Sequence, residues 1–334
     1  MVNVTPELAK HKGARARRPV DVWGFVARYG ALLVLAALIG FMAILEPSTF
    51  PTKSNLINVL SQSALTAIIA MGLTFPLVAG DFDLSIGYAG SCAGVIACQL
   101  MVASGFSIPE AFATAVVFGG LVGVVNGLLV TKVGINPLVA TLGVGTLVVG
   151  INYAIAGGTP VALTHPLSFL NLTLGKLFGV PYPVYVMFGL ALALWMLLNR
   201  TVTGQSMQAV GGNPVAARLS GLHVDRVRVI AFVIAGACAA VTGVLLASTS
   251  GQAASDGADG YLLTAFAACF FGTAVLSTGQ FHIVGTLIGV LTIGVGFNAI
   301  ALIGLATYYQ FLFQGGLLLV GVGVGTFARR RVQA

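Results

Sequence analysis

Long apolar stretches divide the chain, and the charged residues lie almost entirely between them. Most of these stretches come close to the ~20 residues that cross a bilayer as an α-helix. The pattern predicts ten transmembrane helices, at 29–45, 55–79, 84–104, 109–131, 136–156, 182–199, 229–250, 261–276, 282–303 and 309–327. The stretch at 261–276 is short, which suggests a broken or tilted helix. We therefore expect an all-α, polytopic integral membrane protein.

The composition supports lipid as the solvent of this chain. Only 7% of its 334 residues are charged and 57% are hydrophobic, with a mean hydropathy of +1.00. A soluble domain carries about 25% charged residues. The 44 glycines suit close packing of helices in lipid.

The basic residues indicate the orientation of the helices. With the N-terminus placed in the cytoplasm, 14 of the 16 Lys and Arg residues fall inside and only Lys53 and Lys176 fall outside. We expect a multi-pass membrane protein with both termini in the cytoplasm. The predicted parts are a basic tail (1–28), one membrane domain (29–327) with an outside loop (157–181) and a cytoplasmic loop (200–228), and a basic tail (328–334).

The residues give no sign of a catalytic or cofactor site. The four cysteines lie inside apolar stretches without a C-x-x-C pair, and the four histidines are scattered without metal-ligand spacing. No phosphate-binding loop is present. The basic N-terminal tail is explained by the usual positive charge beside a membrane helix, so it does not indicate binding to a nucleic acid. We expect a non-enzymatic chain that binds no metal or cofactor.

The connection at 80–87 contains two carboxylates between two predicted spans. Charge within a membrane is functional by default, so Asp81, Phe82, Asp83 and Ser85 are candidates for the solute pathway or its gate. The alternative is a short polar cytoplasmic turn in which Asp83 caps the next helix.

The cytoplasmic loop contains a predicted short helix. Asn213 is a favoured N-cap, Pro214 suits the first helical position, and Gly221 suits the position after the end. So short a helix is unstable alone and needs a partner surface. One hypothesis is a lever that docks in a groove of a partner protein; the alternative is an amphipathic loop on lipid headgroups. The candidate docking residues are Gly204, Gly211, Gly212, Asn213, Pro214, Ala216, Ala217, Arg218, Leu219, Ser220 and Gly221.

Residues 123–150 resemble 294–321, with Asn126 and Asn298 at similar places. In the predicted topology the two segments run in opposite directions, as in an inverted repeat. The alternative is that Gly- and Leu-rich helices look alike. Asn126 and Asn298, with Phe75 and Phe271, are further pathway candidates, although such side chains more often serve helix packing.

Three motifs occur together and in order: Gly-x-x-Asp-Leu-Ser-x-Gly at 80–87, Ala-x-Gly-Gly-Asn-x-x-Ala-Ala-Arg-Leu-Ser-Gly at 209–221, and Ile-Val-Gly-Thr-Leu-Ile-Gly at 283–289. In this combination the chain resembles the permease subunit of bacterial ribose-type, simple-sugar ABC importers, from about residue 30 to 327.

The resemblance implies a ten-helix fold similar to the cobalamin importer, in a bacterial cytoplasmic (inner) membrane. It implies a pair of permeases, homodimeric or heterodimeric, each on an ATPase subunit that binds ATP and Mg²⁺. A periplasmic or lipid-anchored solute-binding protein would deliver a monosaccharide or related small polar solute. Residues 205–221 match the segment that contacts the ATPase.

The chain departs from the common family form at several positions. Asp81 stands in place of a glycine, Phe82 in place of isoleucine, and Leu262 in place of glutamate. A polyol, deoxysugar, furanosyl signal molecule or branched-chain amino acid therefore remains an alternative solute. The alternative of another class is a stand-alone secondary transporter or channel, which would need coupling carboxylates deep in the bilayer.

Overall fold

The computed structural model describes the backbone of residues 22–164, 166–275 and 279–333, and side chains within these ranges from 29 to 323. Most of the predicted N-terminal tail, 1–21, and the last residue, 334, therefore lie outside the described residues. Helix α1 begins at Val22, seven residues before the predicted start at 29.

Helices occur at all ten predicted places. They are α1 (Val22–Leu45), α2 (Lys53–Ala79), α3 (Ile86–Ala103), α4 (Ile108–Leu128), α5 (Pro137–Ala156), α7 (Tyr182–Arg200), α10 (Val224–Ser250), α11 (Tyr261–Gly272), α12 (Ile283–Leu302) and α13 (Tyr308–Gln333). A π-helical turn, η1 (Leu129–Val133), extends α4.

Seven helices of the described chain are long and apolar enough to cross a membrane: α2, α3, α4 with η1, α5, α7, α10 and α12. Two shorter apolar helices are Tyr29–Leu45, within α1, and α11. The prediction of an all-α polytopic membrane protein is confirmed, and the number of ten crossings stays a prediction. The 12 residues of α11 agree with the predicted short helix.

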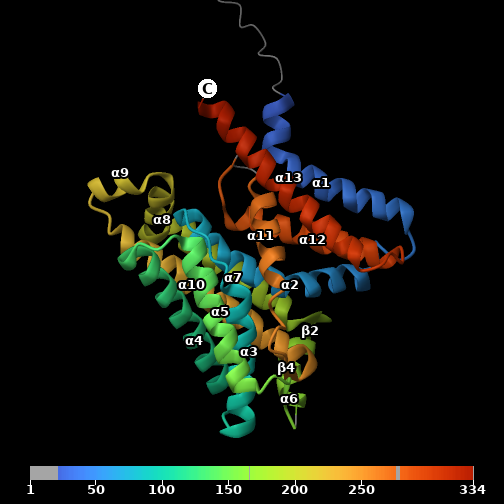
Figure 1. Ribbon diagram of the computed structural model, residues 1–334. Helices are drawn as coiled ribbons and strands as arrows, with labels where there is room; N and C mark the ends of the chain where they lie inside the picture. Colours follow the sequence, from blue (N-terminus) through green and yellow to red (C-terminus); the bar gives the residue numbers. More distant parts are fainter. Residues whose placement is uncertain (1–21, 165, 276–278, 334) are drawn as a thin grey trace, which may run out of the picture.

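Helix α10 lies at the centre of the bundle and packs against α2, α3 and α4 (Figure 1). Small residues bring the backbones together. A Cβ at Gly119 of α4 would overlap the carbonyl oxygen of Gly236 in α10, and a Cβ at Gly123 would overlap that of Phe232. Such small-residue contacts stabilise helix pairs by close packing where lipid supplies no hydrophobic drive.

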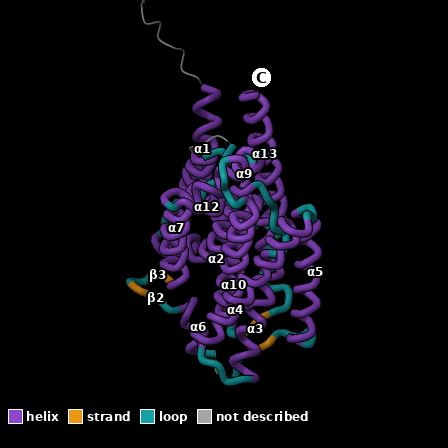
Figure 2. The backbone as a smooth tube through the Cα atoms, turned by 90° about the vertical axis from the view of Figure 1, so that its left-hand side faces the viewer, coloured by secondary structure: helices purple, strands orange, loops and turns teal. Residues whose placement is uncertain are grey.

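The loop at 157–181 is folded. Strand β1 (Val161–Ala162) pairs with β4 (Gln252–Ala253), and β2 (Lys176–Leu177) pairs with β3 (Val180–Pro181). Between them lies α6 (Leu167–Leu174), where the Thr173 hydroxyl is 2.9 Å from that of Ser248 in α10. Figures 1 and 2 place these elements at the end of the bundle away from the C-terminus.

The loop at 200–228, predicted to be cytoplasmic, contains two helices where the sequence predicted one. Helix α8 (Val202–Gly212) precedes α9 (Pro214–Leu219). Helix α8 was missed because three of its 11 residues are glycine and its stability comes from tertiary contacts, with Met207 fully buried.

Candidate functional site

Helix α9 has the N-cap that the sequence predicted. The side-chain oxygen of Asn213 accepts hydrogen bonds from the backbone N–H of Val215 and Ala216, both at 3.0 Å. Pro214 occupies the first helical position, and Gly221 beyond the end has φ +84°, a conformation that favours glycine. The short helix is therefore well specified by its own residues.

The two faces of α9 differ. Ala217 is buried against the body of the protein, whereas Val215 is 68% exposed and Leu219 is 85% exposed. Ser220 is also exposed, and its hydroxyl donates to the carbonyl of Ala216 at 3.0 Å. The outer face thus presents two apolar side chains that no described residue covers.

The backbone of α8 fastens this segment to the membrane helices. A Cβ at Gly211 would overlap the carbonyl oxygen of Val78 in the last turn of α2. A Cβ at Gly204 would overlap the carbonyl oxygens of Leu197 and Leu198 in α7. Gly212, in contrast, has open space around its Cβ position. Of the predicted docking glycines, Gly204 and Gly211 therefore serve internal packing.

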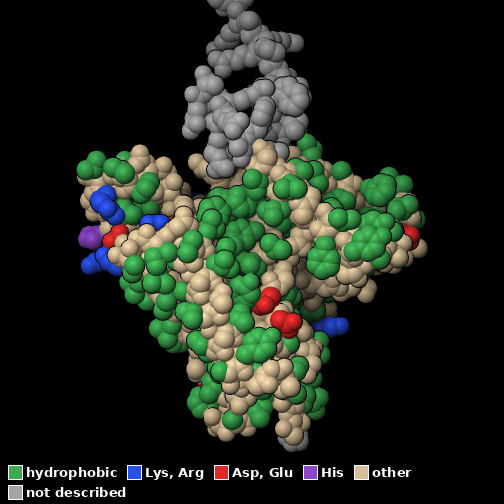
Figure 3. Space-filling view, viewed as in Figure 1, with side chains coloured by type: hydrophobic (Ala, Val, Ile, Leu, Met, Phe, Trp, Pro, Cys, Tyr) green, Lys and Arg blue, Asp and Glu red, His purple; other side chains and the backbone are tan. Residues whose placement is uncertain are grey.

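Charged side chains join α9 to α10 and η1. Asp225 in the first turn of α10 accepts hydrogen bonds from Arg218 of α9 at 3.1 Å and from Lys132 of η1 at 2.8 Å. These groups are partly to largely exposed, so each pair contributes little alone. Figure 3 shows blue, red and purple side chains gathered at the corner where α8 and α9 lie.

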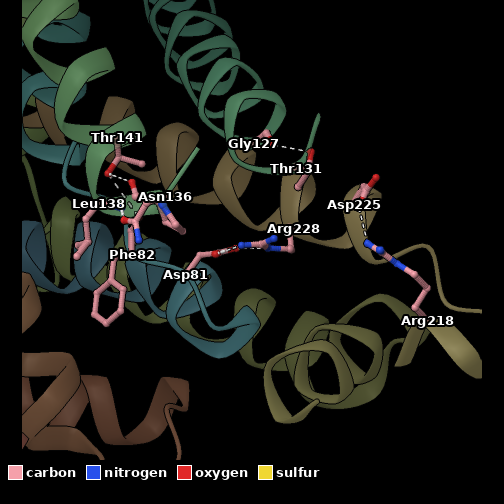
Figure 4. A network of polar contacts seen from close by, with 11 residues as sticks. Asp81, Phe82, Gly127, Thr131, Asn136, Leu138, Thr141, Arg218, Asp225 and Arg228 are labelled. Carbon is pink, nitrogen blue, oxygen red and sulfur yellow. Dashed lines mark hydrogen bonds and ion pairs between the residues drawn. The ribbon is translucent and has the colours of Figure 1, made fainter. Parts of the chain in front are cut away.

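One turn further along α10, Arg228 pairs with the predicted pathway residue Asp81 (Figure 4). The guanidinium donates from Nε to one carboxylate oxygen at 2.6 Å and from Nη2 to the other. The Asp81 side chain is 1% exposed and that of Arg228 is 25% exposed. Asp81 is therefore committed to a forked ion pair between the α2–α3 connection and α10.

Phe82, the next residue, contacts α11. Its ring centroid lies 6.3 Å from that of Phe266 and 6.4 Å from that of Phe270, and Phe281 meets Phe270 edge-on at 5.1 Å. Phe75 and Phe271, which were also predicted for the pathway, are buried, and their role in the pathway stays a prediction.

Asp83 forms a local turn with Ser85 and accepts no hydrogen bond from an amide of α3, so the helix cap of the alternative interpretation is not formed. Its Oδ1 accepts from the Ser85 backbone N–H at 2.9 Å and from the Ser85 hydroxyl at 2.6 Å. The Ser85 hydroxyl in turn accepts from the Asn126 amide of α4 at 2.7 Å. Burial raises the pKa of the Asp83 carboxyl to about 6, against the two hydrogen bonds from Ser85.

The structure does not bring Asn126 and Asn298 together. Asn298 of α12 exchanges two hydrogen bonds, at 3.0 and 2.8 Å, with Asn55 at the start of α2, whereas Asn126 contacts the connection after the end of α2. The two asparagines thus lie near opposite ends of the bundle, as an inverted repeat would place them.

A cavity of about 500 Å³ lies between the first half of α2, the end of α10, the start of α11 and α12. Tyr261 and Thr264 of α11 border it. At ~100° per residue, Phe266 and Phe270 point to the opposite face of α11, toward Phe82. Sequence reasoning missed this cavity, because its polar residues come from four separate segments.

Comparison with known proteins decides the family. The family described as "Branched-chain amino acid transport system / permease component" matches residues 55–322. The chain belongs to this permease family.

Curated relatives of this permease act in sugar import. It is 33% identical to the ribose import permease protein RbsC of Escherichia coli K12, over 87% of this chain and 91% of that one. It is 30% identical to the D-allose transport system permease protein AlsC of the same strain, over 93% and 95%. It is 33% identical to the L-arabinose ABC transporter permease protein AraH of Azospirillum brasilense, over 96% and 94%. No solved structure gives a significant match.

These findings confirm the resemblance to permeases of ribose-type importers. With the seven apolar helices, they support a multi-pass inner-membrane protein that serves as a transport component.

Proposed function

We propose that this permease forms the translocation pathway of an ATP-driven importer for a monosaccharide or related small neutral solute. ATP and Mg²⁺ are bound and hydrolysed by a separate ATPase subunit, and the permease itself catalyses no reaction. A second permease, identical or homologous, completes the pathway. A periplasmic or lipid-anchored binding protein delivers the solute. Support for the solute class comes from relatives named for ribose, allose and arabinose.

One observation carries the proposal: the outward face of α9. A helix of six residues has too few internal hydrogen bonds to persist alone, yet this one holds Val215 and Leu219 out into solvent. A groove on a partner would cover both side chains and leave the capped ends undisturbed. Amphipathic peptides docked in grooves present apolar anchors in this way.

The placement of α9 favours the ATPase as that partner. Helices α8 and α9 lie at the end of the bundle from which α13 and its basic C-terminal residues emerge (Figure 1). The excess of basic residues favours a cytoplasmic location for this end, where ATP is available.

The contacts beneath α9 give a route for movement into the membrane. Helix α8 rests on the last turn of α2 through Gly211, and Arg218 is tied to α10 through Asp225. A displacement of the α8–α9 segment by a nucleotide-driven partner would therefore move α2 and α10 against each other. Packed helices with two arrangements convert a small shift into opening of a gate.

The test compares Leu219→Asp with Leu167→Asp. Leu219 is 85% exposed on α9, and Leu167 is 81% exposed on α6 at the other end of the bundle, so neither change should disturb the core. The complex is purified in mild detergent, ATPase recovery is measured, and the complex is then reconstituted for uptake. We expect Leu219→Asp to lower ATPase recovery and ATP-driven uptake at least tenfold.

Leu167→Asp should leave ATPase recovery unchanged. Equal recovery of the ATPase with both variants would remove α9 as the docking element. Uptake driven by an ion gradient without any ATPase would favour a secondary transporter instead.

A further inference from the structure

The cavity between α2, α10, α11 and α12 has an unusual lining for a membrane protein. Hydroxyl and amide side chains dominate its polar surface, among them Gln62, Ser63, Thr66, Thr249 and Thr264. Its lining contains no Asp, Glu, Lys, Arg or His. Its volume of about 500 Å³ falls within the ~300–1,000 Å³ typical of small-molecule sites.

Ser63 supplies a second, independent observation. Its side chain is 3% exposed, and its hydroxyl has no hydrogen-bond partner among the described residues. The hydroxyl lies against the Cα of Gly294 on α12, where a Cβ would overlap it. A buried hydroxyl without a partner costs about 1–3 kcal/mol, so this one needs a ligand or a water molecule inside the cavity.

The neighbouring carboxylates do not change the character of the lining. Asp259 accepts a hydrogen bond from the Ser91 hydroxyl of α3 at 2.7 Å and is thereby turned to α3. Asp256 lies in the exposed loop beside Gly257, outside the lining. A solute inside the cavity therefore meets neutral donors and acceptors.

The uncharged lining of the cavity favours a neutral solute with many hydroxyl groups. Hydroxyl and amide groups can donate to and accept from a sugar hydroxyl, and the rings of Tyr261 and Phe297 offer apolar faces for its C–H groups. The ammonium and carboxylate of a free amino acid would lose their hydration here without gaining a charged partner.

The cavity is also well separated from α8 along the axis of α2. Ser63 and Val78 are 15 residues apart on α2, or about 22 Å along the helix axis, and Val78 is where α8 packs. The cavity thus belongs to the half of the bundle away from α8 and α9. In the proposed orientation this is the side from which a solute arrives.

We propose that this cavity is a binding site for a neutral polyhydroxylated solute within the permease, so that the membrane subunit itself discriminates sugars from zwitterionic amino acids. The site rests on the proposed import function. Ser63, Gln62 and Thr264 are its specificity-determining residues.

Thiol protection tests the site directly. Thr66→Cys, at a partly exposed position of the cavity lining, is introduced into the full chain in lipid nanodiscs, where the four native cysteines, all buried, give a low background. A neutral maleimide labels the new thiol in the presence of D-ribose, L-arabinose, D-allose or L-leucine. We expect at least one sugar to slow labelling of Thr66→Cys several-fold and L-leucine to have no effect. Ser104→Cys, on the exposed turn after α3 and outside the cavity, is the matched control and should label equally under all conditions.

Transport by the reconstituted complex gives a second readout. Thr264→Val removes one hydroxyl with little change of volume, and we expect the uptake KM to rise roughly 3- to 10-fold, the loss of one or two hydrogen bonds.

The outcomes separate the site from the function. If the unmodified complex shows no ATP-driven uptake, the importer proposal fails. If uptake is normal but no sugar protects Thr66→Cys, or L-leucine protects it equally well, the site proposal fails and the importer stands.

Discussion

The carboxylate of Asp81 is held in a forked ion pair by Arg228, 147 residues away in the chain. Asp81 follows Gly80, the C-cap residue of α2, and Arg228 lies in the second turn of α10. On one side of this pair, α8 packs on the last turn of α2; on the other, Phe82 contacts α11. The Asp81–Arg228 pair thus lies between the α8–α9 segment and α11, the helix that borders the cavity.

The two partners of this pair should differ in their response to mutation. Arg228→Gln leaves the fully buried Asp81 carboxylate without a cation, so we expect the free energy of unfolding to fall by about 3 kcal/mol. Asp81→Asn should cost less, because the partly exposed Arg228 can reach water. The double variant should be more stable than Arg228→Gln alone. Denaturation of the purified permease in mixed micelles measures these differences.

Lys132→Gln is the matched control for this series. It breaks the exposed pair with Asp225, and the expected loss is below about 1 kcal/mol. Equal losses for Lys132→Gln and Arg228→Gln would show that the Asp81–Arg228 pair contributes no more than a surface contact.

The sequence predicted the elements that local chemistry specifies. The apolar stretches located ten helices, and the Asn213–Pro214 pair located α9 with its cap. The sequence also placed a polar turn at Asp83, where the carboxylate accepts from Ser85 two residues on, but not the cap of α3 that was the alternative.

Contacts between distant segments were not accessible in the same way. From the sequence, Arg228 is only one of the 14 Lys and Arg residues that indicate the orientation, because no neighbouring residue links it to Asp81. Helix α8 depends on glycines that fit carbonyl oxygens of other helices, and a glycine-rich stretch alone indicates a loop. The stacked rings of Phe82, Phe266 and Phe270 likewise come together only in the folded bundle.

Adjacent glycines of α8 provide a test of mechanical contact. A methyl group at Gly211 would overlap the carbonyl oxygen of Val78, whereas one at Gly212 would meet nothing within 4 Å. We expect Gly211→Ala to displace α8 from α2 and lower ATP-driven uptake more than tenfold while membrane insertion persists, whereas Gly212→Ala transports normally. Uptake and surface expression are measured in parallel. Normal transport by Gly211→Ala would mean that close contact of α8 with α2 is dispensable.

The α4–α10 interface should show the same dependence on small residues. A Cβ at Gly123 would overlap the backbone of Phe232, while one at Gly120 would meet only Val233 at 3.9 Å, an ordinary contact. We expect Gly123→Ala to destabilise the permease by about 1–3 kcal/mol through overpacking. Gly120→Ala should be neutral or slightly stabilising, since alanine favours helix. Thermal unfolding in detergent measures both, and equal melting temperatures would contradict the close packing of these helices.

Asp83 should make the stability of the permease depend on pH in a direction opposite to that of most carboxylates. Its pKa is raised to about 6 by burial, so the folded state holds this proton more tightly than the unfolded state, where the pKa is near 3.8. Stability from this group therefore rises as pH falls from 7.5 to 5. Asp83→Asn removes the effect. At pH 7.5 the free energy of unfolding of this variant should exceed that of the native chain by up to about 3 kcal/mol. His282, whose pKa burial lowers, works in the other direction but is common to both chains and cancels in the comparison. Unfolding curves at the two pH values measure the difference, and parallel pH profiles for the two chains would show that Asp83 ionises as freely in the folded state as in the unfolded one.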